Sequence, residues 1–303
     1  MDITINEIVK HLENENIHFS FFGNRDVRIN RVANIKNLHD HCISWIRVPE
    51  KLTEEVLKDL SEIKELLIVC PDRINEVNCI VTDDPKRVFF GILNHFFPVK
   101  LASHGISKNA VVLSDKVGEN VSIGPNCYIG EDVYISDDVV IHSNVIIECK
   151  CRIGKGSEIF SGTVIGSDGF GYYYEGDIPY REPHYGGVII GEYVDIGANT
   201  CIDKGVLSDT VIGDHTKIDN LCHIAHNVQI GEKCLVISGS VICGSVTIGD
   251  NDYIAPGTIV KDQVTVGKKV FVGIGSVVTG DVKEDTSVFG VPAKLLIAPR
   301  INK

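Results

Sequence analysis

The sequence predicts a mainly β chain in which a long parallel β-helix follows a small α/β domain. The first observation is an aliphatic residue that recurs every six positions from residue 117 onward. The second is a small or β-branched residue four positions after most of these aliphatic residues. A six-residue period of this composition is typical of a solenoid in which each hexad supplies one short strand and one turn.

The repeat forms three runs of nine, three and twelve aliphatic positions, 24 in all. With three hexads to a coil, the repeat predicts eight coils of 18 residues, about 38 Å long at ~4.8 Å per strand. We expect the aliphatic side chains to point inward and the small residues at the fifth hexad position to fill the corners. The runs begin at Val117, Ile190 and Ile212 and end at Ile165, Ile202 and Val278.

The ten cysteines do not form a Cys-x-x-Cys pair, so the sequence gives no support for a zinc motif. Four of them fall at the fifth hexad position and are predicted to be small, reduced packing residues. These four are Cys127, Cys151, Cys222 and Cys234.

Residues 1–100 predict a small α/β domain. Thr4 and Glu7 form a capping-box pattern, and Asp84 before Pro85 marks a second helix start. No glycine-rich phosphate loop is present, which excludes a P-loop or Rossmann fingerprint. The expected strands are 18–22, 27–32, 43–46, 65–70 and 79–82, with a further helix at 54–60.

Composition excludes several classes of protein. With 41 acidic and 29 basic residues the net charge is −12, which argues against nucleic acid as a partner. No apolar run reaches transmembrane length, and the N-terminus lacks the basic start and apolar stretch of a signal peptide. We expect a cytoplasmic protein.

Two segments interrupt or follow the repeat that we assign to residues 101–285. Residues 167–189 form an insertion rich in glycine and aromatic residues, among them Asp168, Phe170 and Tyr172. Insertions in solenoids often line a binding face, so this one predicts a wall of the site, an arm that packs in a trimer, or both. Residues 286–303 predict a cap and a basic tail that contains Lys294, Arg300 and Lys303.

His226 is the candidate catalytic residue. It is the third residue of its hexad, so its side chain is expected to point outward, and it follows the small Ala225. Asp219 and Asn220 lie on the preceding face, and Gly244 lies one coil further on. A general base beside a bare backbone N–H suits the attack of an amine on a thioester without a covalent intermediate. The alternative is an ordinary surface histidine.

Two other histidines have weaker signals. His223 ends the preceding hexad and is expected to be a surface residue, with a minor substrate-binding role as the alternative. His184 lies in the insertion, where it could contact substrate, but nothing in the sequence determines this.

Three stretches resemble the UDP-3-O-acylglucosamine N-acyltransferases of lipid A synthesis. They are Gly-Ser-Asp-Gly-Phe-Gly-Tyr at 166–172, Ile-Asp-Lys-Gly at 202–205, and Ile-Asp-Asn with Ile-Ala-His-Asn-Val at 218–228. The resemblance implies a left-handed β-helix and a homotrimer with active sites between subunits. It implies that His226 is the general base, that Asp219 and Asn220 assist it, and that the Gly244 backbone forms the oxyanion hole. It also implies that the N-terminal domain holds the nucleotide.

The sequence departs from this family at three places. Gln263 falls where the family has a second active-site histidine, and Trp45 stands in the base-stacking pocket of the N-terminal domain. The chain ends on Gly-Val-Pro-Ala-Lys at 290–294 and a short tail, where the family has helices that engage acyl carrier protein. That ending is typical of transferases that use coenzyme A, so we expect Lys294 and Gly244 to contact an acyl-CoA cosubstrate.

The sequence therefore predicts an N-acyltransferase that moves an acyl group from acyl-CoA to a UDP- or dTDP-linked amino sugar, with no metal and no permanently bound cofactor. Trp45, Asp168, Phe170, Tyr172 and His223 are the expected substrate-binding residues. One alternative is the lipid A enzyme with acyl carrier protein as donor. Others are a non-catalytic scaffold and a zinc enzyme resembling carbonic anhydrase, which needs three histidines where His223 and His226 supply two.

Overall fold

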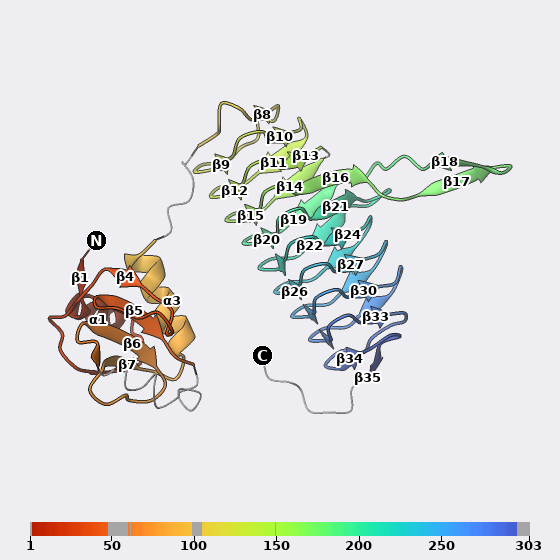
Figure 1. The fold of residues 1–303 in the computed structure, drawn as a ribbon. Helices are drawn as coiled ribbons and strands as arrows, with labels where there is room; N and C mark the ends of the chain where they lie inside the picture. Colours follow the sequence, from red (N-terminus) through yellow and green to blue (C-terminus); the bar gives the residue numbers. More distant parts are fainter. Residues whose placement is uncertain (1, 48–59, 61, 99–104, 149, 296–303) are drawn as a thin grey trace. The chain divides into compact units, whose positions relative to one another are not determined.

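The structure is a computed structural model that describes residues 2–47, 60, 62–98, 105–148 and 150–295. It divides into two compact units, Met1–Leu101 and Ala102–Lys303, which are described separately here (Figure 1). Within the described residues no helix is long and apolar enough to cross a bilayer.

The N-terminal unit is built on a mixed five-stranded sheet in the order β2-β7-β6-β5-β4. β4 to β7 run parallel to their neighbours, and β2 is antiparallel to β7. The elements are β1 (Ile3–Thr4), α1 (Ile5–Asn14), β2 (Ser20–Phe22), β3 (Arg28–Ile29), β4 (Arg31–Val32), β5 (Cys42–Trp45), β6 (Leu66–Cys70), β7 (Asn78–Val81) and α3 (Pro85–Phe96).

Both predicted helix starts of this unit are confirmed. Glu7 N donates to Thr4 Oγ1 over 3.2 Å, while Thr4 N donates to Glu7 Oε2 over 2.7 Å, which completes the capping box. Asp84 caps α3 by accepting from Arg87 N at 3.1 Å. The expected strand at 27–32 is divided into β3, which pairs with β1, and β4, which pairs with β5. The helix expected at 54–60 lies outside the described residues, apart from Leu60.

The second unit is a three-faced parallel β-helix (Figure 1). Strands on each face pair with strands one coil away, as Ile224 does with Ile242, 18 residues on. The nine-stranded face holds β8 (Val111–Val112), β10 (Tyr128–Ile129), β13 (Ile146–Ile147), β16 (Val164–Asp168), β21 (Cys201–Lys204), β24 (His223–Ile224), β27 (Val241–Ile242), β30 (Ile259–Val260) and β33 (Val277–Val278).

The other two faces carry the same register. The seven-stranded face holds β11 (Val133–Ile135), β14 (Cys151–Ile153), β19 (Val188–Ile190), β22 (Thr210–Ile212), β25 (Gln229–Ile230), β28 (Thr247–Ile248) and β31 (Thr265–Val266). The ten-stranded face holds β9 (Ser122–Ile123), β12 (Val140–Ile141), β15 (Glu158–Ile159), β20 (Asp195–Ile196), β23 (Lys217–Ile218), β26 (Leu235–Val236), β29 (Tyr253–Ile254), β32 (Phe271–Val272), β34 (Ser287–Phe289) and β35 (Lys294–Leu295).

The core of the β-helix confirms the repeat. The inward aliphatic residues from Ile123 to Val278 are buried in one continuous cluster. The cysteines predicted at the corners are buried too, at 2% exposure for Cys127, 1% for Cys151, 3% for Cys222 and 0% for Cys234. Apolar burial along the whole axis gives the unit its stability, because each coil covers the open end of the next.

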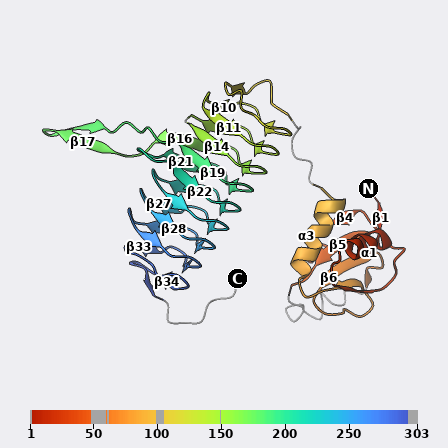
Figure 2. The same cartoon turned by 180° about the vertical axis from the view of Figure 1, so that it is seen from behind.

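The insertion leaves the β-helix as an antiparallel hairpin of β17 (Tyr172–Glu175) and β18 (Ile178–Arg181). Figures 1 and 2 show it projecting from the nine-stranded face beyond β16. The chain returns beside a second insertion between β21 and β22. Tyr185 N donates to Val206 O at 2.7 Å and Gly186 N to Gly205 O at 3.0 Å, so the two insertions lie together on one side of the β-helix.

Candidate active site

The site lies on three neighbouring strands of the nine-stranded face, β21, β24 and β27. β21 supplies Asp203, the turn after β24 supplies His226, and the turn after β27 supplies Gly244. The parallel register places His223 beside Val241 and Ile224 beside Ile242. His226 and Gly244 therefore occupy the same position in successive coils.

The close approach of His226 to the next coil requires glycine at position 244. A Cβ on Gly244 would lie 2.7 Å from both Cε1 and Nε2 of His226, closer than any carbon can pack. The Gly244 backbone consequently forms one wall of the imidazole site, on the side of Nε2.

The backbone N–H of Gly244 has no hydrogen-bond acceptor among the described residues. The flanking N–H groups are both used, by Cys243 to Val260 O and by Ser245 to His226 O, whereas no hydrogen bond from Gly244 N is found within the described part of the chain. Pro125 and Pro256 stand at the same hexad position in other coils, and proline has no N–H. The coil therefore does not need this donor, and it is free to bind a developing oxyanion.

Asn227 determines the tautomer of His226. Asn227 Oδ1 accepts from Val206 N at 3.0 Å, and its Nδ2 donates to Ser208 O at 3.2 Å and to Ser208 Oγ at 2.8 Å, which identifies the oxygen end of the amide. His226 Nδ1 lies 3.1 Å from that same oxygen. Because the oxygen only accepts, Nδ1 carries the hydrogen and Nε2, beside Gly244, carries the lone pair.

Asp203 is the buried acid of the site. It is 6% exposed, and its Oδ2 lies 3.6 Å from His223 Nε2. Burial raises the pKa of the Asp203 carboxyl above its usual range, while the nearby His223, His226 and His184 act in the opposite direction. The Asp203 carboxyl thus interacts electrostatically with three imidazoles. Asp203 belongs to the Ile-Asp-Lys-Gly stretch at 202–205, where it follows inward Ile202 as Ala225 follows Ile224.

Asp219 and Asn220, expected to assist His226, are occupied by the turns of the β-helix instead. Asp219 accepts from Asn220 N at 2.7 Å through Oδ1 and from Ser238 N at 3.2 Å through Oδ2. Asn220 Oδ1 accepts from Ala198 N at 2.6 Å. Within the described residues neither side chain forms a hydrogen bond or an ion pair with His226. They follow β23 on the ten-stranded face, whereas His226 follows β24 on the nine-stranded face.

The expected substrate-binding residues of the insertion are only partly brought together. Asp168 ends β16 beside the site and accepts from Lys204 Nζ at 2.8 Å, a hydrogen bond that lowers the pKa of the Asp168 carboxyl. Phe170 is 87% exposed, and its ring lies 4.9 Å from that of Tyr172, which packs under Arg181 on the hairpin. Among the described residues, no aromatic ring of the hairpin packs against His226. His184 does, with 5.5 Å between the centroids of the His184 and His226 rings.

Trp45 lies in a pocket of about 660 Å³ in the N-terminal unit. The pocket opens at the carboxyl ends of the parallel strands β4 and β5, the usual place for ligands in an open α/β sheet. Trp45 is 6.2 Å from both Phe89 and Phe90 between ring centroids. Asn34 and Arg47 supply polar atoms to the same lining.

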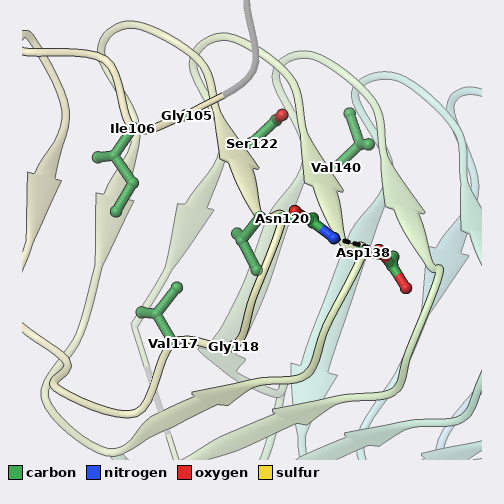
Figure 3. A pocket seen from close by; sticks show the side chains of 9 residues that line it. Gly105, Ile106, Val117, Gly118, Asn120, Ser122, Asp138 and Val140 are labelled. Carbon is green, nitrogen blue, oxygen red and sulfur yellow. Dashed lines mark hydrogen bonds between the residues drawn. The ribbon is translucent and has the colours of Figure 1, made fainter.

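Another pocket, of about 700 Å³, lies at the first coils of the β-helix (Figure 3). Its lining is glycine and aliphatic side chains, with Ser122, Asn120 and Asp138 as the polar groups. Asn120 Nδ2 donates to Asp138 Oδ1 at 3.2 Å, and Asp138 also pairs with Lys155 at 3.4 Å. These contacts hold neighbouring turns together, and they engage Asp138, the carboxylate of the lining.

Lys294, the expected contact for coenzyme A, is exposed in β35 and pairs by backbone with Phe289 of β34. Arg300 and Lys303 lie outside the described residues. The described part of the chain contains no group of three or more His, Cys, Asp or Glu side chains arranged to hold a metal ion.

Known proteins share this fold and these motifs. The family model described as bacterial transferase hexapeptide, six repeats, matches residues 116–148 and 209–244. A UDP-3-O-acylglucosamine N-acyltransferase of Coxiella burnetii is 37% identical over 246 residues, 74% of this chain and 70% of that protein. A Legionella pneumophila protein named UDP-3-O-acylglucosamine N-acyltransferase 2 is 50% identical over 93 residues, and the aligned chain spans only 27% of its length.

Solved structures of acyltransferases with another name share the fold at lower identity. The UDP-N-acetylglucosamine acyltransferase of Bacteroides fragilis has a TM-score of 0.57 and 27% identity over 63% of this chain and 74% of that chain. The Francisella novicida protein of the same name has a TM-score of 0.56 and 27% identity over 63% of this chain and 68% of that chain.

The periodic fold and the matching repeat model define a hexapeptide-repeat transferase built on a left-handed parallel β-helix. Within this class, the chain belongs to the UDP-3-O-acylglucosamine N-acyltransferase family.

Proposed function

We propose that the protein transfers an acyl group from a thioester to the amino group of a UDP-linked 3-O-acylglucosamine. The observation that carries this proposal is the orientation of His226, whose Nδ1 is held by Asn227 while Nε2 faces Gly244. The names of the relatives supply the acceptor, and they favour the lipid A alternative over an unspecified UDP- or dTDP-amino sugar.

The reaction follows from the positions of these groups. The neutral amine attacks the thioester carbonyl carbon, and His226 Nε2 takes the proton that the nitrogen loses. The Gly244 N–H donates to the oxyanion of the tetrahedral intermediate. Its collapse forms the amide, breaks the carbon–sulfur bond, and returns the proton from His226 to the departing thiolate.

Asp203 takes the supporting role that the sequence analysis gave to Asp219. Once His226 is protonated, the site holds an imidazolium next to a carboxylate that is 6% exposed. A buried negative charge stabilises that cation strongly because little solvent screens it. His223 shares the same carboxylate at 3.6 Å and takes a substrate-binding role at the edge of the site.

The pocket around Trp45 is the proposed nucleotide site of the N-terminal unit. An exposed aromatic face stacks on a base regardless of its identity, whereas Asn34 and Arg47 offer polar contacts for base and phosphate. A UDP titration followed by Trp45 fluorescence tests this part separately, because Trp45 is the single tryptophan of the chain.

For the donor, two carriers share the same thioester chemistry. The relatives named UDP-3-O-acylglucosamine N-acyltransferase favour acyl carrier protein, the donor implied by the family resemblance. The exposed Lys294 near the end of the described chain favours acyl-CoA instead. We further propose that the protein is a homotrimer whose hairpin packs on a neighbouring copy, because that hairpin exposes Tyr174 to 68% and Ile178 to 58%.

The experiment is a transfer assay with UDP-3-O-acylglucosamine as acceptor and, in parallel, acyl-CoA or acyl carrier protein thioesters of several chain lengths. We expect turnover with at least one donor, and a loss of about 10²- to 10⁴-fold for His226→Ala. His215→Asn is the matched control, since His215 is an exposed turn histidine with φ 59° that Asn accommodates. Absence of turnover with every donor, or unchanged activity in His226→Ala, contradicts the proposal.

A further inference from the structure

We propose that His184 accepts the hydrogen that the attacking amino group keeps, and so selects an amine over a hydroxyl as acceptor. This inference rests on the proposed N-acyl transfer and adds a specificity-determining residue from the insertion.

The burial of His184 is the first argument. From Phe170 to Tyr185 every residue is exposed or half-buried except His184, which is 6% exposed. The aromatic side chains of this segment point to solvent, with Phe170 at 87% and Tyr185 at 72% exposure. The hydrophobic effect alone would bury the aromatic rings before a histidine. The burial of His184 therefore has another cause, which we infer to be its position in the site.

Hydrogen bonds on either side hold His184 in place. Glu182 N donates to Gly171 O at 2.9 Å, and Tyr185 N donates to Val206 O at 2.7 Å. The backbone of His184 is thus held between the hairpin base and the second insertion, residues 205–209. Asn227, which contacts His226, hydrogen-bonds to the same insertion.

The tautomer of His184 makes it an acceptor. Its Nδ1 lies 2.9 Å from the Glu182 carbonyl oxygen, which can only accept, so Nδ1 carries the hydrogen. Its Nε2 then carries a lone pair, and that atom is buried without a hydrogen-bond partner in the described structure. A buried acceptor without a donor is costly and is retained where a function requires it.

The imidazole of His184 packs against that of the proposed catalytic base. The rings of His184 and His226 meet edge to face at 86°, with centroids 5.5 Å apart. Gly169 lies against both: a Cβ there would be 2.7 Å from His226 Cδ2 and 3.0 Å from His184 Nε2. Any side chain at residue 169 would clash with both imidazoles, so glycine is required there. Because His184 Nε2 is buried, acceptance of the amine hydrogen requires the surrounding backbone to move aside.

The chemistry gives this arrangement its meaning. A neutral amine has two hydrogens, one that His226 removes during attack and one that remains in the amide product. A hydroxyl has only one, so a second acceptor is useful only for an amine. Two nitrogen lone pairs on rings this close can both reach one substrate nitrogen.

Two carboxyl groups of the β-helix, Asp203 and Asp168, lie within electrostatic range of His184. Asp203 lies on the side of β21 and Asp168 on the side of β16, where Lys204 pairs with Asp168 at 2.8 Å. His223 on β24 is 3.6 Å from Asp203. On its own segment His184 faces Glu182 through the backbone carbonyl and the side chain near Gly171.

The test compares His184→Phe, which keeps a flat ring without an acceptor, with His184→Gln, which restores one. With UDP-3-O-acylglucosamine and a fixed donor, we expect kcat/KM to fall roughly 10- to 100-fold in His184→Phe and to recover most of that loss in His184→Gln. Binding without donor is measured for the same amine ligand and for the analogue with a hydroxyl in place of the amine. The wild-type preference for the amine should shrink in His184→Phe.

Equal losses of binding for both ligands in His184→Phe, or no recovery in His184→Gln, overturn the proposal in favour of a packing role. Unchanged kinetics in both variants overturn it as well. In ¹⁵N NMR of the wild type, the amine ligand should shift the His184 Nε2 resonance and the hydroxyl analogue should shift it less. This shift is observed without turnover, so it tests His184 even if the proposed acyl transfer fails.

Discussion

At the scale of single residues, the site depends on contacts that leave no room for substitution. The clearest is the 2.7 Å approach that a Cβ on Gly244 would make to His226 Nε2. Gly244 is not in the left-handed region, so alanine is acceptable to its backbone and its effect comes from the clash alone.

We therefore expect Gly244→Ala to lower kcat about 10²- to 10³-fold by displacing the imidazole and the oxyanion donor. Thermal unfolding should change little, because this position faces outward. Gly280→Ala is the matched control, since no atom lies within 4 Å of its added Cβ. Comparable activity in the two alanine variants would contradict the role of Gly244.

Asp203 leads to a pH prediction. Burial raises its pKa in the folded state, so the folded protein holds this proton to a higher pH than the unfolded chain does. Below the ordinary carboxyl pKa both the folded and the unfolded state are protonated, so Asp203 does not lower the free energy of unfolding there. As pH rises through the ordinary value toward the raised one, the unfolded state gains relative stability.

Asp203→Asn should therefore unfold at a higher temperature than wild type at neutral pH, with the difference shrinking toward low pH. Its activity should fall, by less than the roughly 10²- to 10⁴-fold expected for removal of the base itself. Thermal melts and initial rates measured across pH 4 to 8 check both parts. A variant less stable than wild type at neutral pH would show that the His223 contact outweighs burial.

At the scale of elements, Asn227 joins the second insertion to the catalytic turn. Its side chain bonds to Val206 and Ser208 of the insertion and to His226, while its backbone is left-handed at φ 60°. Glycine accepts that backbone, so Asn227→Gly removes the side chain without adding strain.

This variant should lose about 1–2 kcal/mol of stability from the broken hydrogen bonds. It should also lose activity, because His226 Nδ1 no longer has its acceptor. The control is Asn144→Gly, at the same hexad position with φ 62°, where the side chain bonds only to Asn126 of the previous coil. Denaturant unfolding and steady-state kinetics of the pair separate the two effects, and equal activity in both variants would remove Asn227 from the site.

At the scale of the whole molecule, the hairpin leads to the prediction of a trimer. Sedimentation should give the mass of three chains of 33.2 kDa each. Replacing the exposed Tyr174 and Ile178 with serine should weaken the assembly and lower the mass at low protein concentration. A wild-type mass of one or two chains would contradict the proposed assembly.

The β-helix could be predicted from the sequence because its period is short and each aliphatic position is buried in turn. The acid that we propose as support for His226, Asp203, could not be predicted. Because of the extra residues before Ile212, Ile202 pairs with Ile224 across 22 residues instead of 18. Counting 18 residues from His226 identifies Gly244 but does not lead to Asp203. Asp219 lies closer in sequence but turns onto another face.

The contacts of His184 also could not be predicted from the repeat. An insertion has no register, so its path depends on backbone hydrogen bonds such as that of Tyr185 to Val206. Asn227 was missed for another reason: neighbouring side chains in a strand point apart, but its left-handed turn brings Oδ1 back to His226.

From Ile212 onward, the uniform pairing of coils gives the β-helix the translational symmetry of a one-dimensional crystal. Its unit cell is 18 residues, and the site occupies a single lattice position between two cells. Excising one cell beyond the site, residues 261–278, would bring β34 onto β29, which occupies the position of β32 one period earlier. The shortened chain is expected to fold and to keep the His226–Gly244 pair, as circular dichroism and the transfer assay would show.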